Sequence, residues 1–575
     1  MRLVATSCIA FAMLCAAYSV EAAIYPVTKI ADTNDGMCDM DCSLREAIAA
    51  ANGTVDNDIV AFALPLFSSP QTITLSGGEL VVANNGSLTI FGPGANRLTI
   101  SGNNASRILV SGANVVVNIH NLRFTAGNGV GATNTGRGGA IYNVGGTMLL
   151  ANSILTGNSA ANGGALNNAA SASPAVPANL TILNCVISNN SSTSSGAAMQ
   201  NFSTSTLHIR NTTVNNNNST ATGIAGAFQA NGMVTISNST FSGNTTAGTG
   251  GAIYYNGTGL TMTNVTITGN SSPLGAGGFH KSTTTLNANV RNSIFSGNTG
   301  AAGTTDAAGI VSSQGNNIIQ AVGTSTGWVM SDQQNVDPLL SPLGFHGGFG
   351  MTHFPLSGSP AINMGQDCVT DLSCSAANPP VALNSDERGV ARPFGASVDV
   401  GAVEASGDYY AVLPSAVAGV SYSFTLVPTN GSFTYMLNSG SFGGLTLSGA
   451  TSTTLSGTAP ATGIFNALVH INGTPGQAFH NYRINVLADP NVLSISGRVV
   501  SNTGDPVSKA YISLAGLNGV TYNAITNGFG YFRIDGLPAG LNGTITVANK
   551  KGLTFTPQQI AVTDVIDGYE IRALP

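Results

Sequence analysis

Charged residues are scarce in this chain of 575 residues. Asp, Glu, Lys and Arg make up 8% of it, against roughly 25% in ordinary globular proteins, and no Asp or Glu lies between Glu79 and Asp306. Polysaccharide hydrolases use paired carboxylates as acid and base or nucleophile, and Ca²⁺ sites need carboxylates among their oxygen ligands. The middle of the chain therefore lacks the residues for either kind of site.

The sequence also lacks the marks of a nucleic-acid-binding or membrane-spanning protein. Its net charge is −6, and it has neither a basic stripe nor an aromatic platform for phosphates and bases. One apolar run, Leu3 to Ala17, is too short and wrongly flanked for a membrane span. With Arg2 before it and small residues after it, this run predicts a signal peptide over residues 1–23, cleaved after Ala22 or Ala23. We therefore expect a secreted or cell-surface protein with no transmembrane segment in the mature chain.

Cysteine is rare, and five of the seven residues follow the predicted signal peptide. Cys38 and Cys42, and likewise Cys368 and Cys374, are close pairs that could form disulfides in an oxidising compartment. Metal ligation is the alternative, although no His or further Cys lies near either pair in sequence. Cys185 has the character of a small buried apolar residue.

What the chain does contain is a repeat of 26 to 32 residues that begins with an Asn, as in Asn238-Ser-Thr-Phe-Ser-Gly-Asn244. Apolar residues stand two and four positions before this Asn and three after it, and such steps of two predict strands with one buried face. Gly pairs such as Gly250-Gly251 mark turns. Units of strands and turns that stack on one another predict a right-handed parallel β-helix over residues 71–330.

In such a stack the first Asn of each unit forms one column, and a second Asn column follows. Stacked amides can hydrogen-bond along the axis, which predicts a structural ladder. Asn-X-Ser/Thr triplets could instead be glycan acceptors. The predicted ladder consists of Asn121, Asn152, Asn184, Asn211, Asn238, Asn264 and Asn292, and the second column of Asn158, Asn190, Asn217, Asn244, Asn270 and Asn298.

Residues 24–70 precede the repeats and predict an N-terminal cap. Ser43 and Glu46 have the spacing of a capping box, so we expect a short helix that covers the open strand edges of the solenoid. Nearby, Asp32, Asp35 and Asp39 could bind Ca²⁺, but their spacing fails the EF-hand pattern and a solvated loop is the alternative. No other cofactor is predicted.

Candidates for catalysis are weak. A metal-free lyase could use Arg, Lys or His as base, and His280 with Lys281 is the nearest thing to a cluster. His280 replaces apolar residues of other turns, which favours a structural role. Asp306 leaves a carboxylate site at the C-terminal turns open, while other histidines such as His208 are isolated in sequence.

Three segments follow the repeats. Residues 331–405 predict a C-terminal cap of the solenoid. Residues 408–488 contain alternating apolar runs separated by Gly, Ser, Thr and Pro, which predict an Ig-like β-sandwich. Residues 493–575 predict another small β-sandwich, and they contain no zinc-ligand spacing such as His-x-x-Glu.

Several motifs resemble known families. Asp35-Gly-Met-Cys38 followed by Cys42-Ser-Leu-Arg-Glu-Ala-Ile48 resembles the N-terminal motif of secreted bacterial proteins with a CSLREA domain, whose β-helix has the pectin-lyase-like fold. Arg388-Gly-Val-Ala-Arg-Pro393 and Asp399-Val-Gly-Ala-Val-Glu404 are similar to the end of choice-of-anchor proteins. Residues 408–488 resemble Ig domains of bacterial surface proteins, and residues 493–575 look like the carboxypeptidase-regulatory-like domain, which is related to carbohydrate-binding folds.

The resemblance implies export and a fold but no settled activity, because this fold hosts both enzymes and adhesins. The prediction is an all-β protein: a capped parallel β-helix and two β-sandwich domains. We expect it to be non-catalytic and to present the β-helix for adhesion or for binding a polysaccharide, a cell-surface glycan or another partner. The alternative is a polysaccharide lyase or hydrolase with an atypical site near the C-terminal turns.

Overall fold

A computed structural model describes residues 23–574 apart from 64–65, 84–85, 224–225, 283–286, 302–304, 406–409, 428–433, 449–452, 473–476, 488–491, 517–519, 539–540, 550–551 and 563. The predicted signal peptide lies almost wholly outside the described residues. Within them, no helix is long and apolar enough to cross a membrane.

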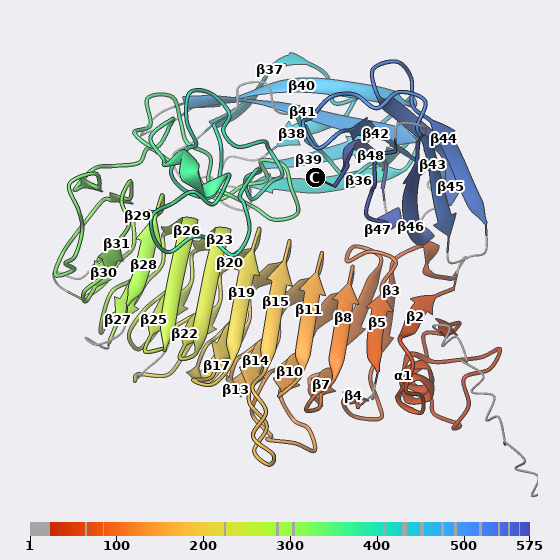
Figure 1. Cartoon of the computed structure of the whole chain (residues 1–575), viewed down its shortest axis with the longest axis horizontal. Coiled ribbons are helices and arrows are strands. Elements are labelled where there is room, and N and C mark those ends of the chain that lie inside the picture. Colours follow the sequence, from red (N-terminus) through yellow and green to blue (C-terminus); the bar gives the residue numbers. More distant parts are fainter. Residues whose placement is uncertain are drawn as a thin grey trace, which may run out of the picture.

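The first part of the chain is a parallel β-solenoid (Figure 1). Its strands stack into a 20-stranded sheet that bends around two faces, a nine-stranded sheet on a third face and a short four-stranded sheet. Every pairing within these sheets is parallel, as between β11 (Thr147–Ala151) and β15 (Asn179–Leu183). Alternate side chains point inward, so one continuous apolar core runs along the stack.

The strands of the first face are β1 (Ile24–Val27), β2 (Asp58–Phe62), β5 (Ser87–Phe91), β8 (Val116–His120), β11, β15, β19 (Thr206–Arg210), β23 (Met233–Ser242), β26 (Gly259–Thr268), β28 (Ala288–Arg291) and β31 (Ser312–Ser313). Those of the second face are β3 (Gln71–Thr74), β6 (Leu98–Ser101), β9 (Arg123–Thr125), β12 (Ile154–Thr156), β16 (Val186–Ser188), β20 (Thr213–Asn215), β29 (Ile294–Ser296), β32 (Ile318–Ile319) and β33 (Gln333–Gln334). The third face consists of β4 (Leu80–Val82), β7 (Leu109–Ser111), β10 (Ile141–Val144), β14 (Leu166–Ala169), β18 (Met199–Asn201), β22 (Phe228–Ala230), β25 (Ile253–Tyr255), β27 (Phe279–Lys281) and β30 (Ala307–Ala308). The short sheet contains β13 (Ser159–Asn162), β17 (Ser191–Ser195), β21 (Asn218–Ser219) and β24 (Thr245–Thr246).

The first Asn of each repeat sits at the bend between the first and second faces. All seven have positive φ, between 44° and 60°, a conformation that Asn adopts more readily than other residues with a side chain. Some of their side-chain amides hydrogen-bond to each other: Asn184 donates to Asn152 at 2.5 Å, and Asn292 donates to Asn264 at 3.3 Å. This column therefore sets the shape of each turn, and its amides point outward.

The second Asn column forms a continuous ladder inside the solenoid. From Asn158 to Asn298, the Nδ2 of each Asn donates to the Oδ1 of the next at 2.8 to 3.0 Å. The same Oδ1 also accepts the backbone N–H of the previous Asn, and each Nδ2 also reaches a backbone carbonyl. Every amide is thus fully used, as a buried polar group requires.

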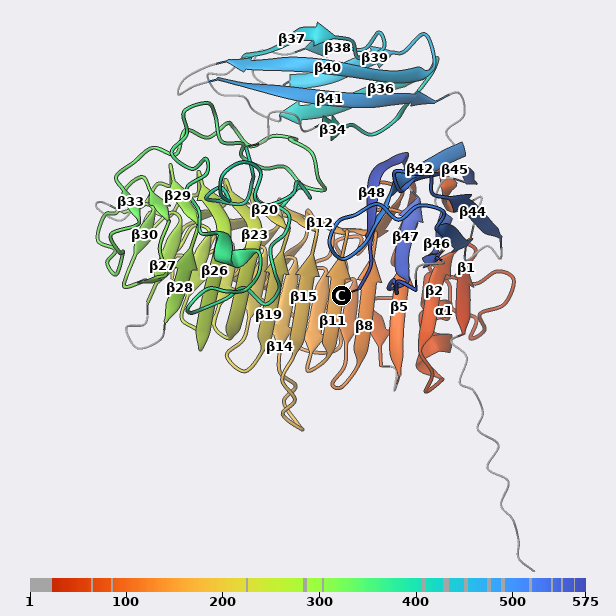
Figure 2. The same ribbon diagram turned by 45° about the horizontal axis from the view of Figure 1, so that its top comes forward.

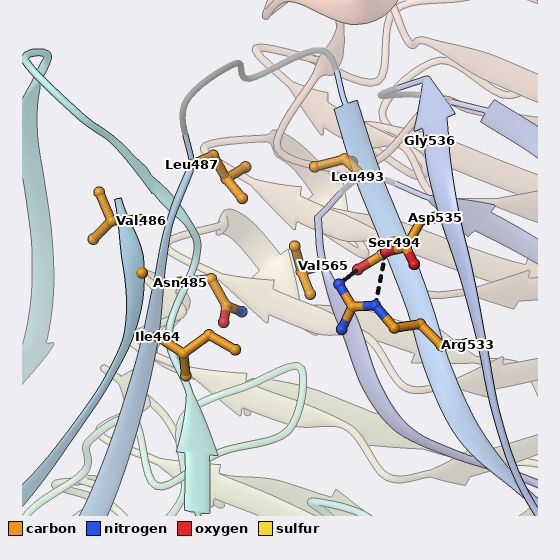
Figure 3. A pocket seen from close by; sticks show the side chains of 11 residues that line it. Ile464, Asn485, Val486, Leu487, Leu493, Ser494, Arg533, Asp535, Gly536 and Val565 are labelled. Carbon is orange, nitrogen blue, oxygen red and sulfur yellow. Dashed lines mark hydrogen bonds and ion pairs between the residues drawn. The ribbon is translucent and has the colours of Figure 1, made fainter. Parts of the chain in front are cut away.

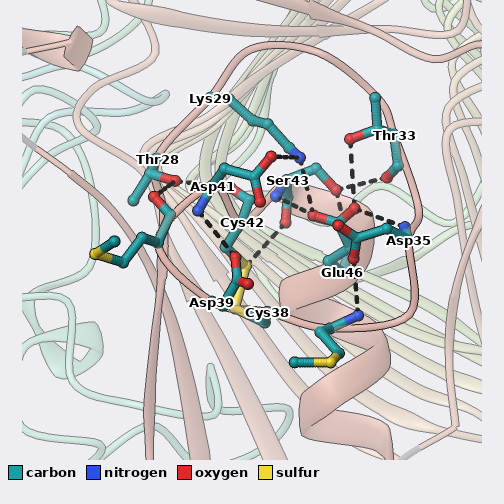
Figure 4. Close-up of a disulfide and its surroundings, with 12 residues drawn as sticks. Thr28, Lys29, Thr33, Asp35, Cys38, Asp39, Asp41, Cys42, Ser43 and Glu46 are labelled. Carbon is teal, nitrogen blue, oxygen red and sulfur yellow. Dashed lines mark hydrogen bonds and ion pairs between the residues drawn. A yellow bond between two sulfur atoms is a disulfide. The ribbon is translucent and has the colours of Figure 1, made fainter.

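The N-terminal cap contains the helix α1 (Leu44–Asn52) with the predicted capping box of Ser43 and Glu46. The apolar face of α1 joins the solenoid core. Glu46 also accepts from the Asp35 N–H and the Thr33 hydroxyl, and lies 3.4 Å from Lys29 (Figure 4). The parallel ladder begins before residue 71, since β1 and β2 pair with each other and β2 with β5.

After β33, which still pairs with β32, the remainder of residues 331–405 runs back along the flank of the solenoid (Figure 2). Outward amides of the bend column bind their backbone: Asn238 donates to the Ser385 carbonyl, and Asn264 to the carbonyls of Asp399 and Gly401. We refer to residues 331–405 as the covering segment. The bend column at its C-terminal turns therefore serves as a docking site for a later part of the chain.

Two modules of mainly antiparallel sheets follow. The first contains β34 (Tyr410–Val412), β35 (Ala416–Val417), β36 (Ser421–Val427), β37 (Thr434–Gly440), β38 (Thr446–Ser448), β39 (Thr453–Thr458), β40 (Gly463–Asn472) and β41 (Gln477–Leu487). The second contains β42 (Val492–Val500), β43 (Tyr511–Gly516), β44 (Thr521–Ile525), β45 (Tyr531–Pro538), β46 (Leu541–Ala548), β47 (Gln558–Val562) and β48 (Ile566–Arg572). Within these modules β34 and β35 pair with β41, and β42 pairs with β48, in parallel. The first module shares its core with the covering segment through Phe354 and Leu356, and the second reaches the N-terminal turns, where Asn542 donates to the Phe91 carbonyl at 3.4 Å.

The predicted fold class is confirmed: a parallel β-solenoid with a helix near its N-terminus is followed by antiparallel sheets.

We expect Asn244→Ala to lower the free energy of unfolding by about 2 to 4 kcal/mol, because it leaves several buried partners without a hydrogen bond. Asn218→Ala, at an exposed position nearby, should change it by less than about 0.5 kcal/mol. Denaturant unfolding of both variants measures the difference. Equal effects of the two substitutions would show that the ladder does not stabilise the fold.

Candidate functional site

The carboxylates at the two ends of the acid-free stretch have structural partners. Glu79 pairs with the buried Arg107 at 2.6 Å. Asp306 ends the Asn ladder: its Oδ1 accepts both donors of Asn298, and its Oδ2 accepts the Ala321 N–H at 2.7 Å. Burial raises the pKa of Asp306. A carboxylate held in this way by three donors is poorly placed to exchange a proton with a substrate.

His280 and Lys281 lie on β27, on the third face of the solenoid. The His280 ring stacks on Tyr254 with ring centroids 5.7 Å apart, and Lys281 is buried. Burial lowers the pKa of both side chains. Neighbouring residues of a strand point to opposite sides, so these two do not form a joint site, and Asp306 is engaged in the ladder.

Asp32, Asp35 and Asp39, the candidate Ca²⁺ ligands of the cap, bind different partners and do not form one site. Asp32 accepts two hydrogen bonds from Arg45 and one each from the Ser76 and Gly77 N–H groups, whereas Asp35 and Asp39 each accept an N–H two residues ahead. In the described part of the chain no group of three His, Cys, Asp or Glu side chains could hold a metal ion. Cys38 is bonded to Cys42 at 2.08 Å, and Cys368 to Cys374 at 2.06 Å.

The covering segment places a carboxylate on the acid-free flank. Glu387 is buried there and accepts hydrogen bonds from the hydroxyls of Thr213 at 2.9 Å and Thr240 at 2.5 Å. Burial raises the pKa of Glu387 well above its usual value, against the opposite effect of the two hydroxyls. Behind it, two fully buried ion pairs, Arg388 with Asp386 and Arg392 with Glu404, hold the covering segment together.

A cluster of histidines joins the covering segment to the first module. The rings of His346 and His480 are 4.8 Å apart, and His353 donates from Nδ1 to the Ser341 carbonyl at 2.7 Å. Burial lowers the pKa of all three, to about 4 for His353 and about 3 for His480, and the Arg388 charge adds to the effect on His346 and His480. All three are thus held neutral inside an interface.

On the first face, Phe91 of β5 contacts the second C-terminal module and Arg291 of β28 contacts the covering segment, and the strands between them carry partly exposed side chains. The outward side chains at the middle of each strand form a row across β15, β19, β23, β26 and β28. In register these are Thr181, His208, Thr235, Thr261 and Asn289. Each is partly exposed. We call this row, together with Arg210 on β19, the open face.

A groove of about 350 Å³ lies at one edge of the open face. Thr235, Thr261 and Asn289 line it together with Met233 and Gly259. Gly259 stands in register with Met233, and a Cβ at Gly259 would meet no atom within 4 Å. The groove therefore exists because one strand lacks a side chain where its neighbour has one.

Polar groups of the open face have unused hydrogen-bonding capacity. Among the described residues, the hydroxyls of Thr235 and Thr261 and the buried Nδ1 of His208 have no hydrogen-bond partner. Burial lowers the pKa of His208, so its ring is neutral at pH 7 and can both donate and accept. The two Thr hydroxyls and the partly exposed part of the His208 side chain are suited to the hydroxyls of a sugar.

A second cleft, of about 270 Å³, lies between the two C-terminal modules (Figure 3). Ile464, Leu487 and Val565 supply apolar lining, and Arg533 pairs with Asp535 at 2.7 Å on the other wall. Because this ion pair already satisfies its charges and is about half exposed, the cleft is a weaker candidate than the open face.

The sequence interpretation missed both Glu387 and the pair formed by His208 and Arg210. The pair had a signal in the sequence, since two residues on either side of the core residue Ile209 point outward from one strand. Glu387 lies 174 residues from Thr213, and no local pattern predicts that contact.

We expect Glu387→Gln to stabilise the protein increasingly above about pH 5. A carboxyl whose folded pKa is raised contributes stability below its unfolded pKa, near 4.5, and loses it as pH rises to the folded value, at about 1.4 kcal/mol per pH unit. Unfolding free energies at pH 5 and pH 8 measure this. Glu570→Gln, at an exposed ion pair, should show no such trend, and a trend shared by both variants would contradict the assignment.

For the histidine cluster we expect the opposite pH dependence: the free energy of unfolding falls as the pH is lowered. A histidine with a lowered folded pKa contributes stability above its unfolded pKa, near 6.5, and loses it as pH falls towards the folded value, again at about 1.4 kcal/mol per unit for each residue. His480→Phe should therefore flatten the loss of unfolding free energy between pH 7 and pH 5. His470→Phe, at a ring that stacks on Phe479, is the control and should leave the slope unchanged; an unchanged slope for His480→Phe as well would overturn the explanation.

Comparison with known proteins assigns part of the chain. Residues 494–567 match the family model of the carboxypeptidase regulatory-like domain, as predicted for this region. No curated protein matches the chain.

Similarities to solved structures are partial. An endo-fucoidan hydrolase from glycoside hydrolase family 107 is 15% identical, with 34% of this chain and 35% of that one covered and a TM-score of 0.12. A second such hydrolase is 16% identical over 28% and 33% of the chains, with a TM-score of 0.13. The Bacillus anthracis TIE protein is 12% identical over 28% and 39%, also with a TM-score of 0.13. The chain thus spans about a third of these proteins, and TM-scores this low carry no argument. What the comparisons do establish is that this chain has a carboxypeptidase regulatory-like domain at its C-terminal end.

Proposed function

We propose that the protein is a secreted or cell-surface protein that binds a polysaccharide or cell-surface glycan on the open face of its solenoid and does not cleave it. The observation that carries this proposal is the groove at Gly259, bordered by the hydroxyls of Thr235 and Thr261, which bond to no other described residue, and by the amide of Asn289. Sugars present hydroxyls that both donate and accept, as Thr, Asn and neutral His side chains do. Disulfides in the two capping regions agree with an exported protein.

Several features support a non-catalytic role. Three described carboxylates of the solenoid and its flank, Glu79, Asp306 and Glu387, each accept hydrogen bonds or pair with a cation inside the structure. The rival, a lyase or hydrolase near the C-terminal turns, would need a free acid or base there. Asp306 and His280 are its candidates, and neither side chain stands free of structural contacts.

The test is to mix residues 24–575 with a panel of neutral and anionic polysaccharides, and to record loss of protein from solution and appearance of new sugar ends in the same tubes. We expect binding without new ends. Gly259→Met should weaken binding by about tenfold or more because it fills the groove with the side chain that β23 carries in register.

Gly528→Met is the matched control. A Cβ at Gly528 also meets no atom within 4 Å, but it lies in the C-terminal domain, so binding should be unchanged. Absence of binding to every polysaccharide, or equal binding by the Gly259→Met variant, would overturn the proposed site. New sugar ends would make the protein an enzyme.

A further inference from the structure

Between Glu79 and Asp306 the charges of the solenoid are all of one sign. From Leu80 to Thr305 the chain contains six arginines, one lysine and no Asp or Glu, a formal charge of +7 in a protein whose total is −6. The sequence shows no basic stripe because these residues are far apart along the chain. Stacking of the turns brings several of them closer together in space. A ligand can pair only with those that other residues leave free.

Most of these cations have partners. Arg107 pairs with Glu79, Arg291 donates to Gln366 and to the Ala376 carbonyl, and Arg137 lies over the Phe202 ring at 4.6 Å. Arg123 donates to the Ala95 carbonyl, and Asp564 lies close enough to Arg97 to affect its pKa. Lys281 is buried.

Arg210 is different. Its side chain is partly exposed and has no hydrogen-bond, ion-pair or ring partner among the described residues. Burial lowers its pKa, and no acid opposes that effect. A guanidinium that is partly desolvated and uncompensated gains more from an arriving anion than a fully hydrated one does.

Arg210 adjoins the groove. It points outward from the same strand as His208, which is in register with Thr235 at the groove's wall. Strand spacing of about 4.8 Å and a rise of about 3.3 Å per residue place its Cα about 8 Å from that of Thr235. An Arg side chain is long enough to span most of that separation.

We propose that the ligand of the open face is an anionic polysaccharide, whose sulfate or carboxylate groups pair with Arg210 while its hydroxyls bond to His208, Thr235 and Thr261. This rests on the proposed function and adds the ligand class. Arg is the residue suited to such a role because its planar fork matches the oxygens of sulfate and carboxylate. The open face offers no Phe, Tyr or Trp on which nucleic-acid bases could stack, which favours a polysaccharide over a nucleic acid.

The test uses polysaccharide pairs that differ only in charge: dextran sulfate with dextran, and polygalacturonate of low with that of high methyl ester content. The protein should bind at least one charged member at least tenfold more tightly than its uncharged partner. A difference between dextran sulfate and dextran indicates a preference for sulfate, and a difference between the two polygalacturonates indicates a preference for carboxylate. Added salt should weaken binding, because counterions compete for the same charges.

Arg210→Gln should weaken binding to the charged member by about tenfold and make it less sensitive to salt. Arg137→Gln removes the same charge at the Phe202 contact and should leave binding unchanged, while Gly259→Met should reduce it. Equal binding of charged and uncharged members, or equal effects of the two Arg variants, would overturn the inference but leave the proposed function standing. Failure to bind any polysaccharide, neutral or charged, would overturn both.

Discussion

Hydrogen bonding along the solenoid axis is the interaction on which this structure depends. Each turn binds the next through its parallel backbone ladder and through buried amides that pass from Asn158 to Asn298 without a break. Such bonds need no charge, which explains how a chain with 8% charged residues can order so many polar side chains in its interior. As a consequence, each amide has its side-chain hydrogen-bond acceptor only when the next turn is in place. At the last turn, where no further Asn follows, the carboxylate of Asp306 takes over the acceptor role.

That arrangement also decides where chemistry can occur. The turns between Glu79 and Asp306 supply hydroxyls, amides and a few cations, and the acids stand at the ends of this stretch, in the cap and in the covering segment. Those acids are used to hold parts of the chain together, as Glu387 does between two threonines. On the proposed function, a ligand meets the open face of the first sheet, where the groups offered to it are hydroxyls, an imidazole and one guanidinium.

Much of the fold follows from local pattern. The apolar steps of two, the repeat length and the Ser43 to Glu46 spacing suffice for the strands, the stack and the capping helix, because each depends on residues within one turn. The bend column could be located but its role could not, since whether an outward amide meets its neighbour or a covering backbone depends on residues such as Ser385, which are about 150 positions away. The open face could be predicted only in part. Alternation puts His208 and Arg210 on one side of their strand, but which face of these turns stays uncovered depends on the path of the covering segment, which contacts Thr213 and Thr240 on the second face.

The path of the covering segment has a consequence for the order of folding. It binds side chains of Asn238 and Asn264, which precede their partners by 147 and 135 residues, and those side chains are aligned only once the turns that bear them have stacked. Contacts within the solenoid close over about 30 residues and form early, whereas a contact that closes so long a loop forms late. In a chain made from its N-terminus, the turns can therefore assemble one upon another before the segment that covers them exists. Until it arrives, the outward amides of those turns are open to water, and its docking completes a surface that the solenoid alone leaves unfinished.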